Sequence, residues 1–386
     1  MEKPKKKLYN LLRSGIFLGA GGVFFAAQTV FAAPSISGIS GTLSEGQTVT
    51  VSGSSFGTKS PVAPVLWDTV DNQAAYAALS SGAAIPVGSG YPWKDNSLGY
   101  NLVKYNIGSG FQGSRSYTAN GNGEATLGDL LLGSYTQNFY LSWKFKPMNS
   151  FTAGDHSTKF HRITDSAADE TRVLVWDQMH HFFFWNSSYC AGDWATWSGN
   201  VGAWNNMETV ISPSNYELRV NGSSLAKINI GACGSALVDK IWKLGLEGGG
   251  NTPPSVQWYM DNIYVDKTLM RIEICSGSTW NSRGNCEVQI PTTTWNNTQV
   301  QFTVNRGSFA ESAAAYLYMV DSSGTANASG YPVTFGSSQG GPSELFTISD
   351  FLQLVSDWLT SASTSDKNSD GLVNTKDLGI MMSDWE

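Results

Sequence analysis

The sequence predicts a mainly β protein that ends in a small helical module. Of its 386 residues, 12% are aromatic, only 14% are charged and 41 are glycine. Ordinary soluble chains have about 25% charged residues and about 7% glycine. Short alternating hydrophobic segments separated by Gly, Ser, Thr and Asn recur between residues 35 and 335, which is typical of antiparallel strands and turns. Helical spacing of hydrophobic residues is confined to the C-terminal stretch, 344–386.

Residues 1–32 have the pattern of a signal peptide. Five basic residues precede an apolar run from Ile16 to Ala27, which is shorter than the about 20 residues of a membrane span. The run leads to Val30-Phe31-Ala32, a small-residue cleavage site. We place the cut after Ala32, with an uncleaved N-terminal anchor as the alternative. The sequence therefore predicts a secreted protein with no membrane span in the mature chain.

Charge and cysteine content fit this prediction. Cleavage would leave 19 basic and 30 acidic residues, a net charge of −11, which argues against nucleic acid as a partner. Cys275 and Cys286 lie eleven residues apart, which leaves Cys190 and Cys233 for each other, so two local disulfides are the simplest of three pairings. A zinc site is the alternative, but the usual short Cys-x-x-Cys spacing is missing.

The first mature segment, 33–60, predicts a strand pair in which Val49, Val51 and Phe56 alternate with small polar residues. Residues 46–57 (GQTVTVSGSSFG) resemble the opening of the IPT/TIG family of immunoglobulin-like sandwiches, and residues 287–307 resemble its second half. The segment is too short to close a sandwich. We therefore expect a split domain in which 33–60 and 268–336 form one sandwich around an insertion. Two unrelated β units are the alternative.

The insertion, 61–267, contains many strand candidates and no convincing long amphipathic helix, which predicts a two-sheet jelly roll. Residues 202–228 and 256–266 resemble the concanavalin A-like lectin and glucanase superfamily. In this region we expect Trp204 to cap the core. Asn221-Gly222 is expected to supply the positive φ angles of a tight hairpin.

A polar stretch, 337–343, is expected to be a flexible linker. Residues 366–377 (DKNSDGLVNTKD) have the oxygen spacing of a calcium loop with Gly371 at its sixth position and Val373 packed inward. A solvated acidic turn and a magnesium site are the alternatives. The predicted ligands are the side chains of Asp366, Asn368, Asp370, Asn374 and Asp377 and the carbonyl of Leu372.

The tail, 344–386, is internally duplicated, because residues 350–358 (DFLQLVSDW) match 377–385 (DLGIMMSDW). This arrangement resembles a type I dockerin, a module that binds cohesin partners. The resemblance implies a single Ca²⁺, since Gln339, Gly341 and Ser343 replace the acidic ligands in the first copy. It also implies partner contacts at Thr375 and Lys376. A calcium clip without a partner is the alternative.

Catalytic residues in the insertion form no complete set. The E-x-D-x-x-E string of the related glucanases is missing, and Asp261 and Asp266 should face opposite sides of a regular strand. Asp261 is a candidate structural calcium ligand or loop anchor. Weak lyase candidates are Gln178 and His180, because "QMH" resembles the Q-I-H string of alginate lyases, and a second pair is Lys159 with His161.

Sugar binding without chemistry needs aromatic faces and a few hydrogen-bonding groups. Trp194 and Trp197 lie in a turn-rich segment after Cys190 and are candidates for a glycan platform, with packing over the core as the alternative. The favoured hypothesis is a secreted, calcium-binding, carbohydrate-binding protein of extracellular polysaccharide utilisation. A polysaccharide lyase or glycoside hydrolase, and a non-enzymatic adhesion or assembly scaffold, are the alternatives.

Overall fold

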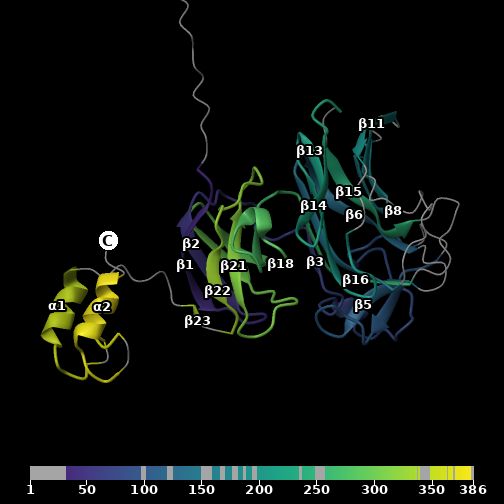
Figure 1. The fold of residues 1–386 in the computed structure, drawn as a ribbon. Helices are drawn as coiled ribbons and strands as arrows, with labels where there is room; N and C mark the ends of the chain where they lie inside the picture. Colours follow the sequence, from purple (N-terminus) through teal and green to yellow (C-terminus); the bar gives the residue numbers. More distant parts are fainter. Residues whose placement is uncertain are drawn as a thin grey trace, which may run out of the picture. The chain divides into compact units, whose positions relative to one another are not determined.

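The computed structural model describes residues 32–96, 101–119, 125–148, 159–165, 170–175, 181–185, 188–193, 198–233, 237–247, 257–336, 338–339, 348–362, 364–367 and 370–383. Strands dominate these residues, all strand pairings are antiparallel, and the two α-helices lie in the tail (Figure 1). The prediction of a mainly β fold is confirmed. No helix in the described part of the chain is long and apolar enough to cross a membrane. The expected signal peptide lies outside the described residues, apart from Ala32.

A small β-sandwich combines strands from both ends of the chain. One sheet has the order β19-β20-β2-β1-β23 and the other the order β18-β17-β21-β22. The strands of the first sheet are β1 (Ser35–Thr42), β2 (Thr48–Ser54), β19 (Ile290–Trp295), β20 (Gln299–Thr303) and β23 (Ser338–Gln339). Those of the second are β17 (Arg271–Cys275), β18 (Cys286–Val288), β21 (Ala314–Val320) and β22 (Tyr331–Thr334), with a 3-10 turn η2 at Trp280–Ser282.

The pairing of β2 with β20 joins the two ends of the chain in one sheet. Val49 lies opposite Phe302, and Val51 lies opposite Val300. All four side chains are buried in one hydrophobic cluster with Ile272 and other residues of β17 and β21. Alternation along β2 therefore buries one face against strands that follow the insertion. Assignment of this sandwich to the IPT/TIG family remains a prediction.

A large β-sandwich holds the strands between β2 and β17. Its eight-stranded sheet has the order β14-β13-β12-β7-β16-β5-β4, with β3 also paired to β16. These strands are β3 (Leu66–Asp68), β4 (Lys104–Ile107), β5 (Arg115–Ala119), β7 (Phe139–Pro147), β12 (Asn205–Ile211), β13 (Asn215–Val220), β14 (Ser223–Asn229) and β16 (Trp258–Asp266). A 3-10 turn, η1, spans Ala74–Tyr76.

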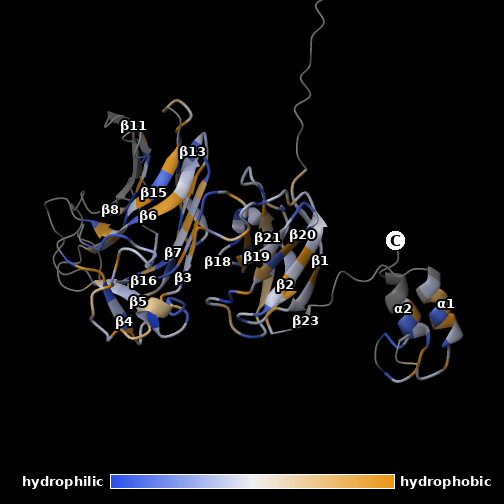
Figure 2. Ribbon diagram, turned by 180° about the vertical axis from the view of Figure 1, so that it is seen from behind, coloured by the Kyte–Doolittle hydropathy of each residue, from blue (hydrophilic) through white to orange (hydrophobic). Residues whose placement is uncertain are grey.

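The six-stranded sheet of the large sandwich has the order β11-β10-β9-β8-β15-β6. Figure 2 shows hydrophobic and hydrophilic residues alternating along strands of both sheets, as expected when one face is buried. The core between the sheets includes Leu141, Trp143, Met207 and Leu244. The strands are β6 (Ala125–Thr136), β8 (Lys159–Asp165), β9 (Glu170–Val175), β10 (His181–Trp185), β11 (Ser188–Asp193) and β15 (Val238–Glu247).

Two disulfides form with the expected pairing. Cys190 of β11 is bonded to Cys233, and Cys275 of β17 is bonded to Cys286 of β18. The second bridge joins directly paired positions of neighbouring strands. Disulfides are typical of oxidising compartments.

The stretch expected to be a linker, 337–343, contains two described residues, and both belong to a sheet. Ser338 and Gln339 form β23, which pairs with Thr42 and Gly41 at the end of β1. These two residues pair because an edge strand offers unpaired backbone groups to any short extended segment.

The tail contains α1 (Ile348–Ser356) and α2 (Thr375–Ser383). Leu354 of α1 and Val373 are buried and pack with Phe351, Ala362 and Leu378. Leu359 N–H donates to the Val373 carbonyl, and Val373 N–H donates to the Thr360 carbonyl. These bonds join the segment after α1 to the loop before α2, so the two copies of the duplicated unit form one small core.

Candidate functional site

The outward face of the eight-stranded sheet is polar and buried. Pairing in register places Lys144 of β7, Asn206 of β12 and Asp261 of β16 on this face, and Glu208 shares it because it lies opposite Ser142. The side chains of Glu208, Lys144 and Asp261 are almost fully buried. A buried charge requires a partner, and residues of the small sandwich supply several of them.

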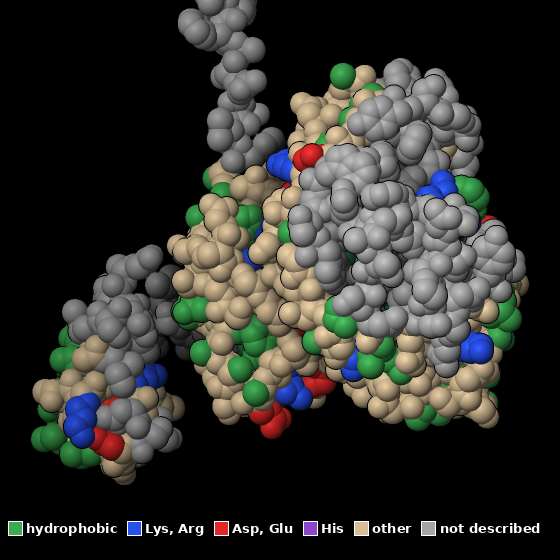
Figure 3. All heavy atoms as spheres, turned by 45° about the vertical axis from the view of Figure 1, so that its right-hand side comes forward, with side chains coloured by type: hydrophobic (Ala, Val, Ile, Leu, Met, Phe, Trp, Pro, Cys, Tyr) green, Lys and Arg blue, Asp and Glu red, His purple; other side chains and the backbone are tan. Residues whose placement is uncertain are grey.

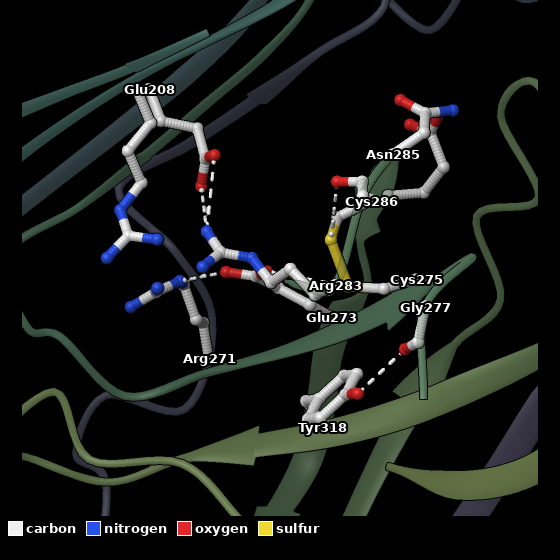
Figure 4. Close-up of polar contacts among 12 residues, drawn as sticks. Glu208, Arg271, Glu273, Cys275, Gly277, Arg283, Asn285, Cys286 and Tyr318 are labelled. Atoms are coloured by element: carbon white, nitrogen blue, oxygen red, sulfur yellow. Dashed lines mark hydrogen bonds and ion pairs between the residues drawn. A yellow bond between two sulfur atoms is a disulfide. The ribbon is translucent and has the colours of Figure 1, made fainter. Parts of the chain in front are cut away.

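Glu208, Arg283 and Glu273 form the centre of an ion-pair network between the two sandwiches (Figure 4). Arg283 Nη2 lies 3.2 Å from Glu208 Oε1, and its Nε lies 3.0 Å from Glu273 Oε2. Arg271 Nε donates to Glu273 over 2.6 Å, and the Tyr140 hydroxyl donates to Glu208 over 2.9 Å. A second pair joins Lys144 Nζ to Glu287 Oε2 at 2.8 Å.

The charges of this network set the protonation of Glu208. Burial alone would raise the pKa of its carboxyl group, but the positive charges of Arg283, Arg219 and Arg271 and the hydrogen bond from Tyr140 outweigh that effect. The pKa of Glu208 therefore lies below its usual value, and the group stays ionised at neutral pH. The network links the two sandwiches through compensated charges.

Asp261 is a loop anchor. Its carboxylate accepts hydrogen bonds of 2.8 Å from the backbone N–H groups of Phe111 and Asn262. A bulge follows at Asn262, where φ is +44°, and it shifts the register so that Asp261 and Asp266 face the same side. The expectation of opposite faces was wrong, because an extra residue reverses the alternation of a strand.

The hairpin turn at Asn221-Gly222 touches the small sandwich. Both residues have the positive φ angles expected, +51° and +81°. A Cβ atom on Gly222 would lie 2.0 Å from the Gly284 carbonyl oxygen, so only glycine permits this approach. The turn therefore fixes the β13–β14 hairpin against the loop before β18.

A pocket of about 360 Å³ lies on one side of this turn. We call it the amide pocket. It is lined by Phe111, Lys144, Asn200, Trp204, Asn205, Asn206, Asn221, Asn285 and Ser308. Trp204 is half-buried and meets Phe111 edge-on, with ring centroids 5.7 Å apart. The expectation that Trp204 caps the core was wrong, since its ring lies in the pocket wall.

Asn206 is the polar centre of the amide pocket. Its backbone N–H donates to Asn221 Oδ1 over 2.9 Å, but its side-chain amide, in a residue only 6% exposed, has no hydrogen-bond partner among the described residues. Lys144 adds no free charge to the pocket, because Glu287 neutralises it. The pocket therefore offers an aromatic wall, an available amide and no net charge.

Most of the glycan and lyase candidates chosen from the sequence cannot be placed. Trp194, Trp197, Gln178 and His180 are outside the described residues, in segments that follow β11 or connect β9 with β10 of the six-stranded sheet. His161, on β8 of that sheet, is only 1% exposed, and its Nε2 lies 2.9 Å from the Thr209 hydroxyl. It is therefore a buried residue between the two sheets.

The outward face of the six-stranded sheet carries a cluster that the sequence did not suggest. A bulge in β15 places Trp242 beside Lys243, and Lys243 lies opposite Arg162 of β8. Glu247 accepts from Arg162 over 2.6 Å and from Lys243 over 2.8 Å. Burial alone would raise the pKa of Glu247, but these hydrogen bonds outweigh it and lower the pKa.

Hydrogen bonds to its own carboxylates hold the backbone of the predicted calcium loop in a turn. Asp366 accepts hydrogen bonds from the N–H groups of Asp370 and Gly371, and Gly371 has a φ of +86°. Asp377 is fully buried and accepts from the N–H groups of Lys367 and Asn374. These residues fit a hard oxygen-binding cation.

Three further predicted residues of the tail, Leu372, Thr375 and Lys376, lie at the end of the loop and the start of α2. The Leu372 carbonyl accepts from Asn374 Nδ2, Lys376 Nζ lies 2.9 Å from Asp370 Oδ2, and Thr375 is exposed at the start of α2. Asn368 lies outside the described residues. Among the described residues, the one set of three acidic, His or Cys ligand atoms within 4.8 Å is Glu273, Cys275 and Cys286, whose sulfurs are joined in a disulfide.

Sequence signals for the amide pocket were weak. Trp204 directly precedes β12, Asn205 and Asn206 begin that strand, and Asn285 lies between Gly284 and the first residue of β18, so each is ordinary by itself. Figure 3 shows one face of the molecule, on which the charged side chains of the described residues are scattered rather than gathered into a patch. Since the lining of the amide pocket is uncharged apart from Lys144, a search for charged motifs would miss it.

No protein-family model and no curated protein matches the chain. Among solved structures it is similar to the cellulose-induced protein Cip1, with 14% identity and a TM-score of 0.36 over 53% of this chain and 97% of that chain. It is also similar to a Trypanosoma rangeli sialidase, with 13% identity and a TM-score of 0.29 over 52% of this chain and 35% of that chain. An alginate lyase from Corynebacterium sp. is similar with 12% identity and a TM-score of 0.27 over 39% of this chain and 75% of that chain. Similarities this distant assign neither a ligand nor an activity.

Proposed function

We propose that this protein binds polysaccharide outside the cell and that the amide pocket holds one uncharged sugar unit. The observation that carries the proposal is the buried Asn206 amide, without a partner among the described residues, beside the half-buried Trp204 ring. A primary amide both donates and accepts, as a sugar hydroxyl does. The indole face suits the C–H face of a pyranose ring.

The size and charge of the pocket support an uncharged ligand. Its volume of about 360 Å³ is at the small end of ligand pockets, so we expect it to take a single sugar unit and not a long stretch of chain. The Lys144 ammonium is held at 2.8 Å by Glu287. A charged sugar would therefore gain nothing in this pocket over a neutral one.

The test is binding of the chain without residues 1–32 to a panel of neutral and acidic oligosaccharides by calorimetry. Asn206→Ala should weaken binding of a neutral ligand about 2-fold to 12-fold, for the loss of one hydrogen bond. Trp204→Ala should weaken it as well, because the ring face that packs on the sugar is lost. Tyr135→Ala, which removes an exposed ring outside the pocket, is the control. Equal affinity of all four proteins would reject the proposed site.

The same panel tests the enzymatic alternative. A lyase would produce unsaturated ends that absorb ultraviolet light, and a hydrolase would produce new reducing ends. We expect retention of the ligand without either product. Turnover of any polysaccharide would replace the binding function with catalysis.

We also propose that residues 366–377 bind one Ca²⁺ through Asp366, Asn368, Asp370, the Leu372 carbonyl, Asn374 and Asp377. The closed loop, the turn at Gly371 and the fully buried Asp377 carboxylate support this. Bound calcium would hold the loop shut against α2. The dockerin resemblance suggests that Thr375 and Lys376 then contact a cohesin-type partner.

Calcium binding is tested by titrating CaCl₂ into chelator-treated protein, with MgCl₂ as the comparison. We expect one Ca²⁺ per chain and loss of the tail's protease resistance when the ion is removed. Asp366→Asn should abolish binding, whereas Asp357→Asn, a carboxylate of the first copy, should not. Unchanged protease resistance after chelation would reject the calcium site.

A further inference from the structure

A second pocket lies on the other side of the Asn221-Gly222 turn. Its volume is about 420 Å³, and its lining includes Gly222 and Gly284, whereas the amide pocket is lined by the adjoining Asn221 and Asn285. The close approach of Gly222 to the Gly284 carbonyl therefore separates two neighbouring pockets along the junction of the sandwiches. We call the second one the arginine pocket.

The arginine pocket presents hydrogen-bond donors. Arg219 and Arg283 line it together with Trp280, and no Asp or Glu is among the residues that form it. Arg219 Nε and Arg283 Nη1 are buried and have no hydrogen-bond partner among the described residues. Arg283 is only 1% exposed, so an unused donor there is costly unless a ligand or water accepts from it.

Both arginines are also paired with carboxylates that do not line the pocket: Arg219 Nη2 lies 2.9 Å from Glu217 Oε1, and Arg283 is paired with Glu208 and Glu273. The pocket therefore offers unused donor atoms rather than an excess of positive charge. Glu208 and Glu273 are fully buried and bind other atoms of Arg283, so they fix its guanidinium group without filling the pocket. Trp280 packs over the same group, with its ring centroid 4.1 Å from the Arg283 Cζ atom. The guanidinium group is thus held in one orientation, as directional hydrogen bonding to the oxygens of an anion requires.

We infer that the arginine pocket binds the anionic group of a sugar unit, either a carboxylate or a sulfate ester, next to the uncharged unit held in the amide pocket. This inference rests on the proposed function. Both groups are acceptors without hydrogens, which matches a lining of guanidinium donors, Ser223 and Asn281. The ligand class is then an acidic polysaccharide that contains both charged and uncharged units.

The experiment compares four oligosaccharide types of equal length: neutral, uronate-containing, the same uronate after carboxyl reduction, and sulfated. Wild-type protein should bind at least one acidic type about 10-fold or more tightly than the neutral and reduced types, since hydrogen bonds to charged groups are the stronger ones. Preference for uronate or for sulfate identifies the anion. Equal affinity for all four types overturns the inference.

Two kinds of variant locate the effect. Arg219→Gln should remove the preference for acidic ligands and leave affinity for the neutral type within twofold. Ser223→Asp places a carboxylate at an exposed position of the pocket and should do the same, whereas Ser223→Asn, of the same size and without charge, should not. The inference is overturned if the preference for acidic over neutral ligands persists in both Arg219→Gln and Ser223→Asp. If one of these variants folds poorly, the other one alone decides.

The outcomes also separate this inference from the proposed function. If no oligosaccharide binds, or if Asn206→Ala has no effect on any of them, the proposed function fails and the inference fails with it. If neutral ligands bind and depend on Asn206 but acidic ones gain nothing, only the inference fails. Raising NaCl from 50 to 300 mM should weaken the acidic ligands alone, because screening acts on charged contacts.

Discussion

On the two outward faces of the large sandwich, buried charges are compensated by partners of different origin. On the eight-stranded sheet, Glu208 is fully buried and its main partner, Arg283, lies 75 residues away in the small sandwich. On the six-stranded sheet, Arg162 and Glu247 are 23% and 14% exposed and pair within one sheet. The first face is an interface between sandwiches, and the second is a partly solvated network.

This difference shows that polar alternation along a strand does not identify a solvated surface. Glu208 and Glu247 both occupy strands and both have lowered pKa values because cations compensate their burial. They differ in the origin of the cations and in the depth of burial. The interface on the eight-stranded sheet brings polar groups of both sandwiches to one junction, where both pockets lie.

The largest expected difference between the faces is in stability. Arg283→Met leaves Glu208 and Glu273 buried without their shared cation and should cost about 3–5 kcal/mol of unfolding free energy. Arg162→Met on the other face should cost at most about 1 kcal/mol, because its pair is partly screened by water. Denaturant unfolding measures both. Similar losses would contradict the distinction between the faces.

A smaller effect is expected at the turn that joins the sandwiches. Gly222→Ala and Gly202→Ala both place alanine at a positive φ, but only at Gly222 does the new Cβ meet backbone. Gly222→Ala should therefore cost about 1–3 kcal/mol more than Gly202→Ala. Thermal unfolding of the two variants gives the comparison. A Gly222→Ala variant no worse than Gly202→Ala would show that the contact is loose.

The two faces should also differ in their response to acid. The lowered pKa of Glu208 means that its ionised form stabilises the fold above about pH 4.3, the usual pKa of glutamate, and that this stability is lost as pH falls through the lowered value. Glu208→Gln should flatten this acid-side slope. Glu247→Gln should flatten it less, since Glu247 is more exposed. Unfolding free energy measured from pH 6 to 3 tests the order.

The smallest expected effect concerns the aromatic rings that cover the cations. Trp280→Leu removes a ring centroid that lies 4.1 Å from Arg283 Cζ in a buried setting, which should cost about 2 kcal/mol. Trp242→Leu removes one at 5.4 Å from Arg162 Cζ on the more exposed face and should cost about 0.5–1 kcal/mol. Chemical denaturation again provides the measurement, and a reversed order would count against the comparison.

Local sequence patterns predicted local structure well. Alternation around Val49 and Val51, the positive φ angles at Asn221-Gly222 and the turn at Gly371 are all present, because each depends on a few neighbouring residues. The disulfide pairing also followed from spacing alone. Such features can be predicted without knowing what packs against them.

The contacts that build the candidate site depend on distant side chains and could not be predicted. Nothing near Glu208 in the sequence indicates Arg283, and nothing near Trp204 indicates that Phe111, Asn285 and Ser308 complete a pocket with it. The bulge at Asn262 likewise reversed an argument based on regular alternation. For the candidate site, the sequence supplied residue types, and tertiary packing decided which of them meet.

The pairing of β2 with β20 has a consequence for how the chain matures. Strands β1 and β2 emerge from the ribosome first, but β20 follows only about 250 residues later. Both sheets of the large sandwich consist of strands that lie in between, so that sandwich can be completed while β1 and β2 still wait for β20. Closing so long a loop is intrinsically slow. A polypeptide truncated before residue 299 should therefore expose the unpaired edge of β2, which makes the interval of translation before β20 emerges prone to aggregation.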